Sequence, residues 1–137
     1  MEVFKDSQFI GKELKCHKDF IPYLTLMNTK AKDLDLEIYI TSSLRDTIVV
    51  PEAVVTPAKM SNHLVGFAID CNLVEKDKWW NNAKLKYPTG NVLKFIEYCG
   101  TIKVRWGGFF HTPDNVHFDY PLNLKNPEKY KEILESK

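Results

Sequence analysis

Residues 61–70 read SNHLVGFAID and lead into a predicted strand, FAIDCNL at residues 67–73. Alternation along this strand places Ala68 and Asp70 on one face and the larger apolar residues on the other. Aspartate is depleted in strands, and a carboxylate near a core needs a hydrogen-bonding partner or a metal. His63 lies seven residues before Asp70. This stretch therefore offers an imidazole and a carboxylate beside one sheet.

A second stretch, WGGFFHTPDNVHF at residues 106–118, carries Asp114 and His117 three residues apart. His117 falls within a predicted strand over residues 116–120, where an imidazole, like the carboxylate of Asp70, needs a hydrogen-bonding partner or a metal. Asp114 follows Pro113 and by itself fits an ordinary turn residue. Two histidines and one carboxylate can hold zinc with one position open for water. The remaining carboxylate can then accept a proton from that water.

Arg45 follows a third predicted strand, LEIYITS at residues 36–42, which alternates and is rich in β-branched residues. Site residues are commonly carried just past the end of a strand. From the residues alone two interpretations stay open for Arg45. It is either a solvated surface arginine or a group that stabilises the oxyanion formed when an amide carbonyl is attacked.

The size and composition fit one globular domain. The chain has 137 residues, of which 44% are hydrophobic and 27% are charged, and its formal net charge is +1. A net charge this small gives no electrostatic indication that the protein binds nucleic acid.

The three cysteines are odd in number and form no Cys-x-x-Cys motif, so we expect free buried thiols. Residues 1–15 lack the apolar run of a signal peptide and no segment is long enough to span a membrane, which predicts a protein made in the cytoplasm.

The other predicted elements complete an α+β fold. A helical stripe runs through residues 20–34, with Asp19 as N-cap and Pro22 in the first turn. Asn91 is expected to cap a second helix that ends at Gly100, and Asn126 caps the last one. Residues 102–106 form a strand, and residues 47–60 form a long loop. We expect a small, mostly antiparallel sheet with helices packed on one side and a zinc site in a cleft on the sheet.

The motif S-x-H-x-x-G-x-A-x-D at residues 61–70, followed by D-x-x-H at residues 114–117, resembles a family of bacterial cell-wall peptidases. These zinc enzymes cut peptides that contain D-amino acids, and they include D-alanyl-D-alanine carboxypeptidases, dipeptidases and L-alanyl-D-glutamate endopeptidases. The resemblance implies that His63, Asp70 and His117 bind Zn²⁺ and that Asp114 is the general base. It also implies that Arg45 and Ser61 contact the substrate and that Arg45 is catalytic.

Residues 106–108, Trp-Gly-Gly, resemble the L-alanyl-D-glutamate branch, which also favours aspartate as the base. The expected protein is thus a single zinc peptidase domain over residues 1–137, resembling a phage endolysin. We expect a monomer that binds a peptidoglycan peptide, neither nucleic acid nor membrane, and acts on the wall after release from the cytoplasm. The alternatives are a D-alanyl-D-alanine carboxypeptidase or dipeptidase, and a non-catalytic, metal-stabilised wall-binding or phage structural module.

Overall fold

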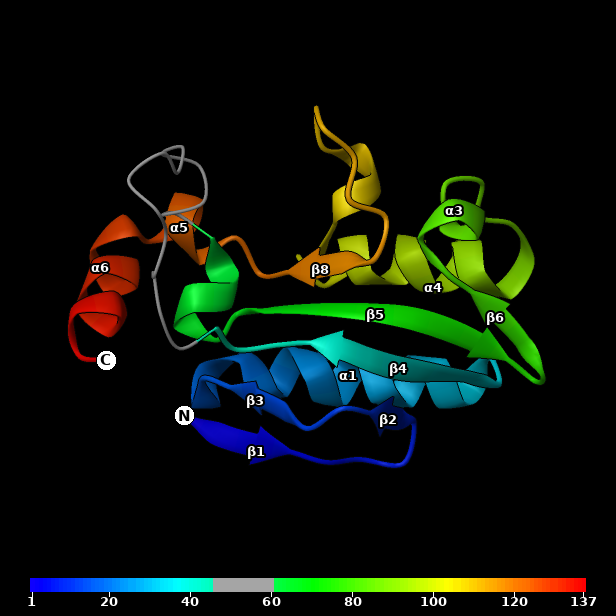
Figure 1. Ribbon diagram of the computed structural model, residues 1–137, viewed down its shortest axis with the longest axis horizontal. Helices are drawn as coiled ribbons and strands as arrows, with labels where there is room; N and C mark the ends of the chain where they lie inside the picture. The colour runs from blue at the N-terminus through cyan, green and yellow to red at the C-terminus, as the bar shows by residue number, and fades with distance from the viewer. Residues whose placement is uncertain (46–60) are drawn as a thin grey trace.

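The computed structural model describes residues 1–45 and 61–137, and its centre is a six-stranded sheet (Figure 1). Five strands follow the order β2-β4-β5-β8-β7, and β6 pairs with the outer part of β5. Within the described ranges, β2–β4 is the one parallel pair of this sheet and the other pairs are antiparallel. The bounds are Phe9–Gly11 (β2), Leu36–Ser42 (β4), Ala68–Glu75 (β5), Lys78–Trp80 (β6), Arg105–Trp106 (β7) and His117–Asp119 (β8). The predicted α+β class with a mostly antiparallel sheet is confirmed.

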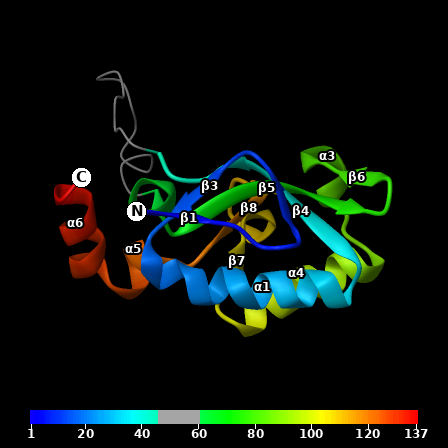
Figure 2. The ribbon, with the colours of Figure 1, turned by 90° about the horizontal axis from the view of Figure 1, so that it is seen from below.

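Two long helices, α1 (Ile21–Asp33) and α4 (Gly90–Thr101), cover one face of this sheet (Figure 2). The predicted helical stripe is confirmed, since Phe20, Leu24, Met27 and Ala31 are all fully buried. On the sheet side the core is completed by Ile69 and its apolar neighbours on β4 and β5. Asp70, near the start of β5, projects from the opposite face of the sheet because it alternates with the core residues Ile69 and Cys71.

Smaller elements flank the sheet. β1 (Glu2–Phe4) and β3 (Leu14–Cys16) form a separate antiparallel pair. Among the described residues, the 3₁₀ helices are η1 (Lys18–Phe20), η2 (Asn62–Val65) and η3 (Gly107–Phe109), and the other short helices are α3 (Asn82–Leu85), α5 (Leu122–Lys125) and α6 (Pro127–Glu135). In Figure 1, α5 and α6 lie beside η2, at the end of the sheet where the first histidine motif enters β5.

The helix starts differ in two places from the sequence prediction. Asp19 lies inside η1, where its backbone N–H donates to the ring of His17, and Phe20 precedes α1 without a side-chain cap. Asn91 lies inside α4, which begins after Thr89, and its amide donates to the Leu34 carbonyl across the helix pair. Neither side chain caps its helix: that of Asp19 pairs with Lys129, and that of Asn91 binds the Leu34 carbonyl. The Asn126 cap is confirmed, since its side chain accepts from the Lys129 N–H.

The predicted strand at residues 102–106 is shorter in the structure, because only Arg105–Trp106 pairs with β8. Lys103 has a φ of 71°, in the left-handed region, and this turn delays the start of the strand. The predicted loop at residues 47–60 lies outside the described residues. All three cysteines are free and buried, as expected. Among the described residues every helix is too short or too polar to cross a lipid bilayer.

Candidate metal centre

His63 is presented by a short turn that the first motif builds. The Ser61 hydroxyl accepts a hydrogen bond from the His63 N–H at 3.2 Å and caps η2. Gly66 ends η2 with a φ of 77°, and a Cβ there would lie 2.5 Å from the His17 nitrogen. Only glycine meets both conditions. The serine and the glycine of the motif thus hold His63 at the entrance to β5, and the structure gives Ser61 a capping role.

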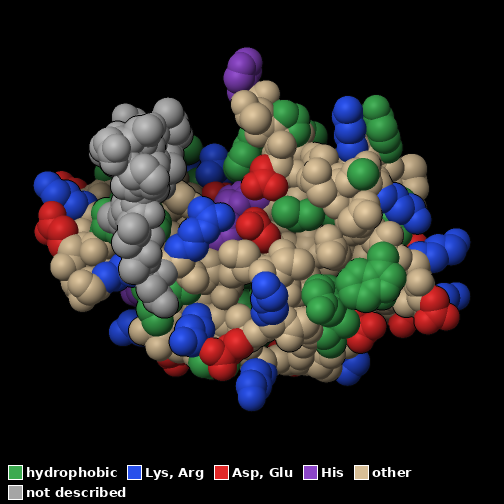
Figure 3. Space-filling model, viewed as in Figure 1, with side chains coloured by type: hydrophobic (Ala, Val, Ile, Leu, Met, Phe, Trp, Pro, Cys, Tyr) green, Lys and Arg blue, Asp and Glu red, His purple; other side chains and the backbone are tan. Residues whose placement is uncertain are grey.

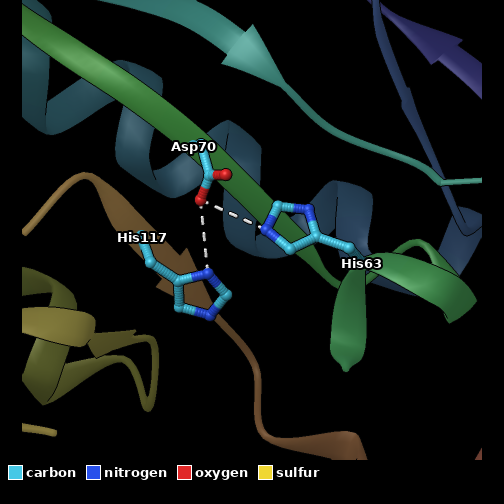
Figure 4. Close-up of side chains that lie close together, drawn as sticks. All are labelled: His63, Asp70 and His117. Carbon is cyan, nitrogen blue, oxygen red and sulfur yellow. Dashed lines mark hydrogen bonds and ion pairs between the residues drawn. The ribbon is translucent and has the colours of Figure 1, made fainter. Parts of the chain in front are cut away.

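Asp70 and His117 face the same site because they are register partners across β5 and β8. Side chains of directly paired residues lie on the same face of a sheet. Asp70 Oδ1 lies 3.2 Å from His63 Nε2 and 3.3 Å from His117 Nδ1 (Figure 4). The three candidate ligand atoms all lie within 4.8 Å of one another. The structure therefore brings together the three residues that the sequence assigned to the metal.

Each histidine has one ring nitrogen that points away from the centre, and the hydrogen bond of that nitrogen determines which atom faces the centre. His63 Nδ1 donates to the Ser43 carbonyl at 2.7 Å, and His117 Nε2 donates to Asp119 Oδ2 at 2.9 Å. When both imidazoles are neutral, the facing atoms His63 Nε2, His117 Nδ1 and Asp70 Oδ1 all present lone pairs to one another; a proton on either ring replaces one of these lone pairs by a hydrogen bond to Asp70. The arrangement with neutral rings is repulsive unless a cation lies between the three atoms, and hydrogen bonds like those to Ser43 and Asp119 commonly orient metal-binding histidines.

The spacing of these atoms suits zinc. Ligand atoms about 2.1 Å from a tetrahedral zinc ion are separated from each other by roughly 3.4 Å, close to the 3.2 and 3.3 Å found here. The side chains of His63, His117 and Asp70 are 3%, 9% and 15% exposed, so the three candidate ligands are largely shielded from solvent. In Figure 3 histidine side chains lie in a hollow on this face, with acidic and basic side chains around them.

The titration of the cluster without metal follows from its charges. Burial raises the pKa of Asp70, but hydrogen bonds from His117 and His63 outweigh it and hold the pKa of that carboxyl well below its usual range. Burial lowers the pKa of His117, whereas hydrogen bonds to Asp119 and Asp70 raise it, with a net rise to about 9. Asp70 is therefore ionised near neutral pH, and a proton on His117 occupies the place that a metal ion would take.

The sequence motifs assign no role to Asp119, and the structure shows it behind the ligands. Its side chain is 2% exposed and is hydrogen-bonded by His117, Arg105 and Asn62. Burial raises the pKa of Asp119, but these donors outweigh it and hold the pKa at about 2. The only sequence signal was strand alternation, which placed Asp119 on the same face as His117.

Arg45 lies close to Asp70, and the backbone of Asp114 contacts that of His117. Arg45 donates its backbone N–H to the His63 carbonyl at 3.0 Å, and its half-exposed guanidinium lies 4.0 Å from Asp70 Oδ2. The Asp114 side chain is exposed, and its backbone carbonyl accepts from the His117 N–H at 3.1 Å. A Cβ on Gly107 would lie 2.2 Å from that carbonyl oxygen, so the tight turn that places Asp114 requires glycine.

The comparison with known families agrees with this geometry. Residues 55–120 match the model of an M15 peptidase family described as D-alanyl-D-alanine carboxypeptidase. The match includes His63, Asp70 and His117, whereas Arg45 lies before it. No curated protein matches the chain. Peptidases of the matched family depend on zinc, and the His/Asp/His group could hold such an ion. Together these findings show that this part of the chain is similar to zinc metallopeptidases.

Proposed function

We propose that the protein is a zinc-dependent L-alanyl-D-glutamate endopeptidase that cuts the stem peptide of bacterial peptidoglycan. The observation that carries the proposal is the convergence of one candidate ligand atom each from His63, Asp70 and His117, all within 4.8 Å of one another. When bound there, zinc supplies a Lewis acid for the scissile carbonyl and lowers the pKa of water from about 15.7 to about 7.

The exposed residues beside the ligands supply the other groups that amide hydrolysis needs. The carboxylate of Asp114 accepts the proton of the attacking water and then passes it to the leaving amine. The Arg45 guanidinium, close to Asp70, stabilises the negative charge that develops on the carbonyl oxygen. Water adds to the carbonyl carbon, the C–N bond breaks, and an acid and an amine are released.

Asp119 does not fit the role of the base. Both of its oxygens already accept hydrogen bonds, and four donor contacts of 2.8–2.9 Å surround them. Its side chain is 2% exposed, so a substrate water has no access to a free lone pair. The Asp114 carboxylate has no hydrogen-bond or ion-pair partner among the described residues and is open to solvent. These differences support Asp114 as the base.

The choice of bond rests on resemblance. The Trp-Gly-Gly sequence at residues 106–108 and an aspartate base both favour the L-alanyl-D-glutamate branch. The description of the matched family favours the runner-up, a D-alanyl-D-alanine carboxypeptidase. In the endolysin role proposed here, the protein acts on the wall after release from the cytoplasm.

Purified protein incubated with peptidoglycan sacculi tests the proposal, with parallel samples containing a chelator and chelator followed by excess zinc. Mass spectrometry of the products identifies the bond. New amino-terminal D-glutamate is expected, whereas D-alanine released from sacculi would indicate a carboxypeptidase. A parallel sample with the free dipeptide D-alanyl-D-alanine tests for a dipeptidase, which would split it into two D-alanines. Zinc-loaded protein that releases nothing would instead point to the non-catalytic module. The matched control is Asp114→Asn, which should retain zinc.

A further inference from the structure

Asp119 is a buried carboxylate that the proposed chemistry does not use. Its Oδ2 accepts from His117 Nε2 at 2.9 Å and from Asn62 Nδ2 at 2.9 Å, while Arg105 donates to both of its oxygens at 2.8 Å. A buried charge is costly unless it is paired and hydrogen-bonded. Here every contact is charge-assisted, so the arrangement is fixed before any ligand arrives.

Asn62 connects this carboxylate to the other histidine. It precedes His63 in η2 and is itself 3% exposed. Its amide nitrogen donates to Asp119 Oδ2 and to Asn123 Oδ1, both at 2.9 Å, and its oxygen accepts from the Asn123 N–H at 3.1 Å. The turn that carries His63 and the strand that carries His117 are therefore joined behind the ligands, through Asp119.

We infer that Asp119 is a positioning residue for the metal, and that Asn62 extends its effect to His63. The inference rests on the zinc site of the proposed function. By accepting from Nε2, Asp119 fixes the ring orientation and the tautomer in which Nδ1 of His117 faces Asp70 and His63. Arg105 holds the carboxylate by both oxygens, which prevents it from rotating toward the centre. Without Asp119 the imidazole can turn about its side-chain bonds and present either nitrogen.

Zinc affinity of the purified variants, measured by competition with a chromophoric chelator, tests this inference without substrate. Asp119→Asn should bind zinc about 10–100-fold more weakly, the usual loss when a partner of a histidine ligand is removed. Asn62→Ala leaves the Asp119–Arg105 pair in place and should lose less, under about 10-fold. Co²⁺-substituted Asp119→Asn should show an altered visible absorption spectrum, because the geometry around the ion changes.

Two control variants separate positioning from general destabilisation. Leu24→Ala removes a fully buried core side chain on α1 and should lower the melting temperature while keeping wild-type zinc affinity. Asp19→Asn removes a surface carboxylate that is paired with Lys129 and should change neither quantity. The inference is overturned by wild-type affinity and spectrum in folded Asp119→Asn, or by an equal loss of affinity in Leu24→Ala.

If Asp119→Asn does not fold, Asn62→Ala decides, and unchanged zinc affinity in that variant overturns the inference. Because zinc binding is measured without substrate, a wild-type protein that binds zinc tightly but cuts no peptide would overturn the proposed function alone. The affinity differences between variants would then still decide the role of Asp119.

Discussion

The three candidate ligands and the two residues proposed to react with substrate are held in opposite ways. The ligand side chains are at most 15% exposed, and the far nitrogen of each histidine is engaged by Ser43 or Asp119. The Arg45 side chain is 51% exposed, and that of Asp114 is exposed without a hydrogen-bond or ion-pair partner in the described part of the chain. One half of the site is fixed in advance, and the other is open to solvent.

This difference follows from what each half must do. A metal site needs its ligands fixed near their final geometry before the ion binds. A general base and an oxyanion donor work on a substrate that is not yet present, and their hydrogen bonds often tighten only in the complex. Substitutions in the buried half should therefore change metal content, whereas substitutions in the exposed half should change rate and leave the metal in place.

The largest effect is expected in the buried half. His63→Ala, Asp70→Ala and His117→Ala each remove one of three protein ligands, so each should lower zinc content and abolish hydrolysis. Elemental analysis of the purified variants, together with product release from sacculi, measures both. Stoichiometric zinc and full activity in any one variant would remove that residue from the centre.

Asp114→Asn should show the next largest effect. The amide keeps the size of the side chain but cannot accept a proton, so turnover should fall by roughly 10²–10⁴ while zinc content stays at the wild-type level. Rates and zinc content of the same preparation measure the separation. The matched control is Asp119→Asn, for which loss of zinc should accompany loss of rate. An active, zinc-replete Asp114→Asn beside a zinc-replete but inactive Asp119→Asn would reverse the assignment of the base.

Arg45→Ala should cost somewhat less, on the order of 10²–10³ in rate, because it removes one donor to the developing oxyanion. Its zinc affinity should be unchanged, since the guanidinium lies 4.0 Å from Asp70 and does not bind the centre. Arg45→Lys should recover only part of the rate, because lysine lacks the planar fork. Steady-state kinetics on a soluble stem peptide measures this, and wild-type rates would leave Arg45 a solvated surface residue.

Chelation should produce the smallest structural effect. The hydrogen bonds behind the ligands do not involve the metal, so the core should remain closed when zinc is removed. Burial raises the pKa of the Cys16 thiol to about 11 and that of Cys71 well above its ordinary value. All three thiols should therefore resist alkylation at neutral pH with or without chelator, and react only in denaturant. Rapid alkylation of the chelated protein would show that zinc holds the core together.

Much of this arrangement could be predicted from sequence because its signals are local. Alternation identified β4 and β5, helical spacing identified α1, and the two short motifs identified the ligands. The structure adds that Ser61 and Gly66 serve the backbone of the motif. The proximity of Arg45 to Asp70 was not predicted; it follows from the pairing of the end of β4 with the start of β5.

The parts that could not be predicted depend on contacts between distant segments. Asp119 contacts Asn62, which is 57 residues away in the sequence, and Arg105, which is 14 residues away. The periodicity of a sequence does not predict contacts between such distant residues. Asn91 has the residue type of a cap but is used to join two helices. The strands β1, β2 and β3 have three residues each, too few to show alternation. In each case the structure depends on contacts with residues that are distant in the sequence.

The pairing of β5 with β8 spans only three residue pairs, from Ala68 with Asp119 to Asp70 with His117. In any sheet, a slip of one residue turns every side chain of the moved strand to the other face. Such a slip would bury His117 against the helices and point Phe118 at Asp70, so no three-ligand centre would exist. Only this register forms the candidate metal centre, so a bound zinc ion would stabilise the correctly paired sheet against the slipped one.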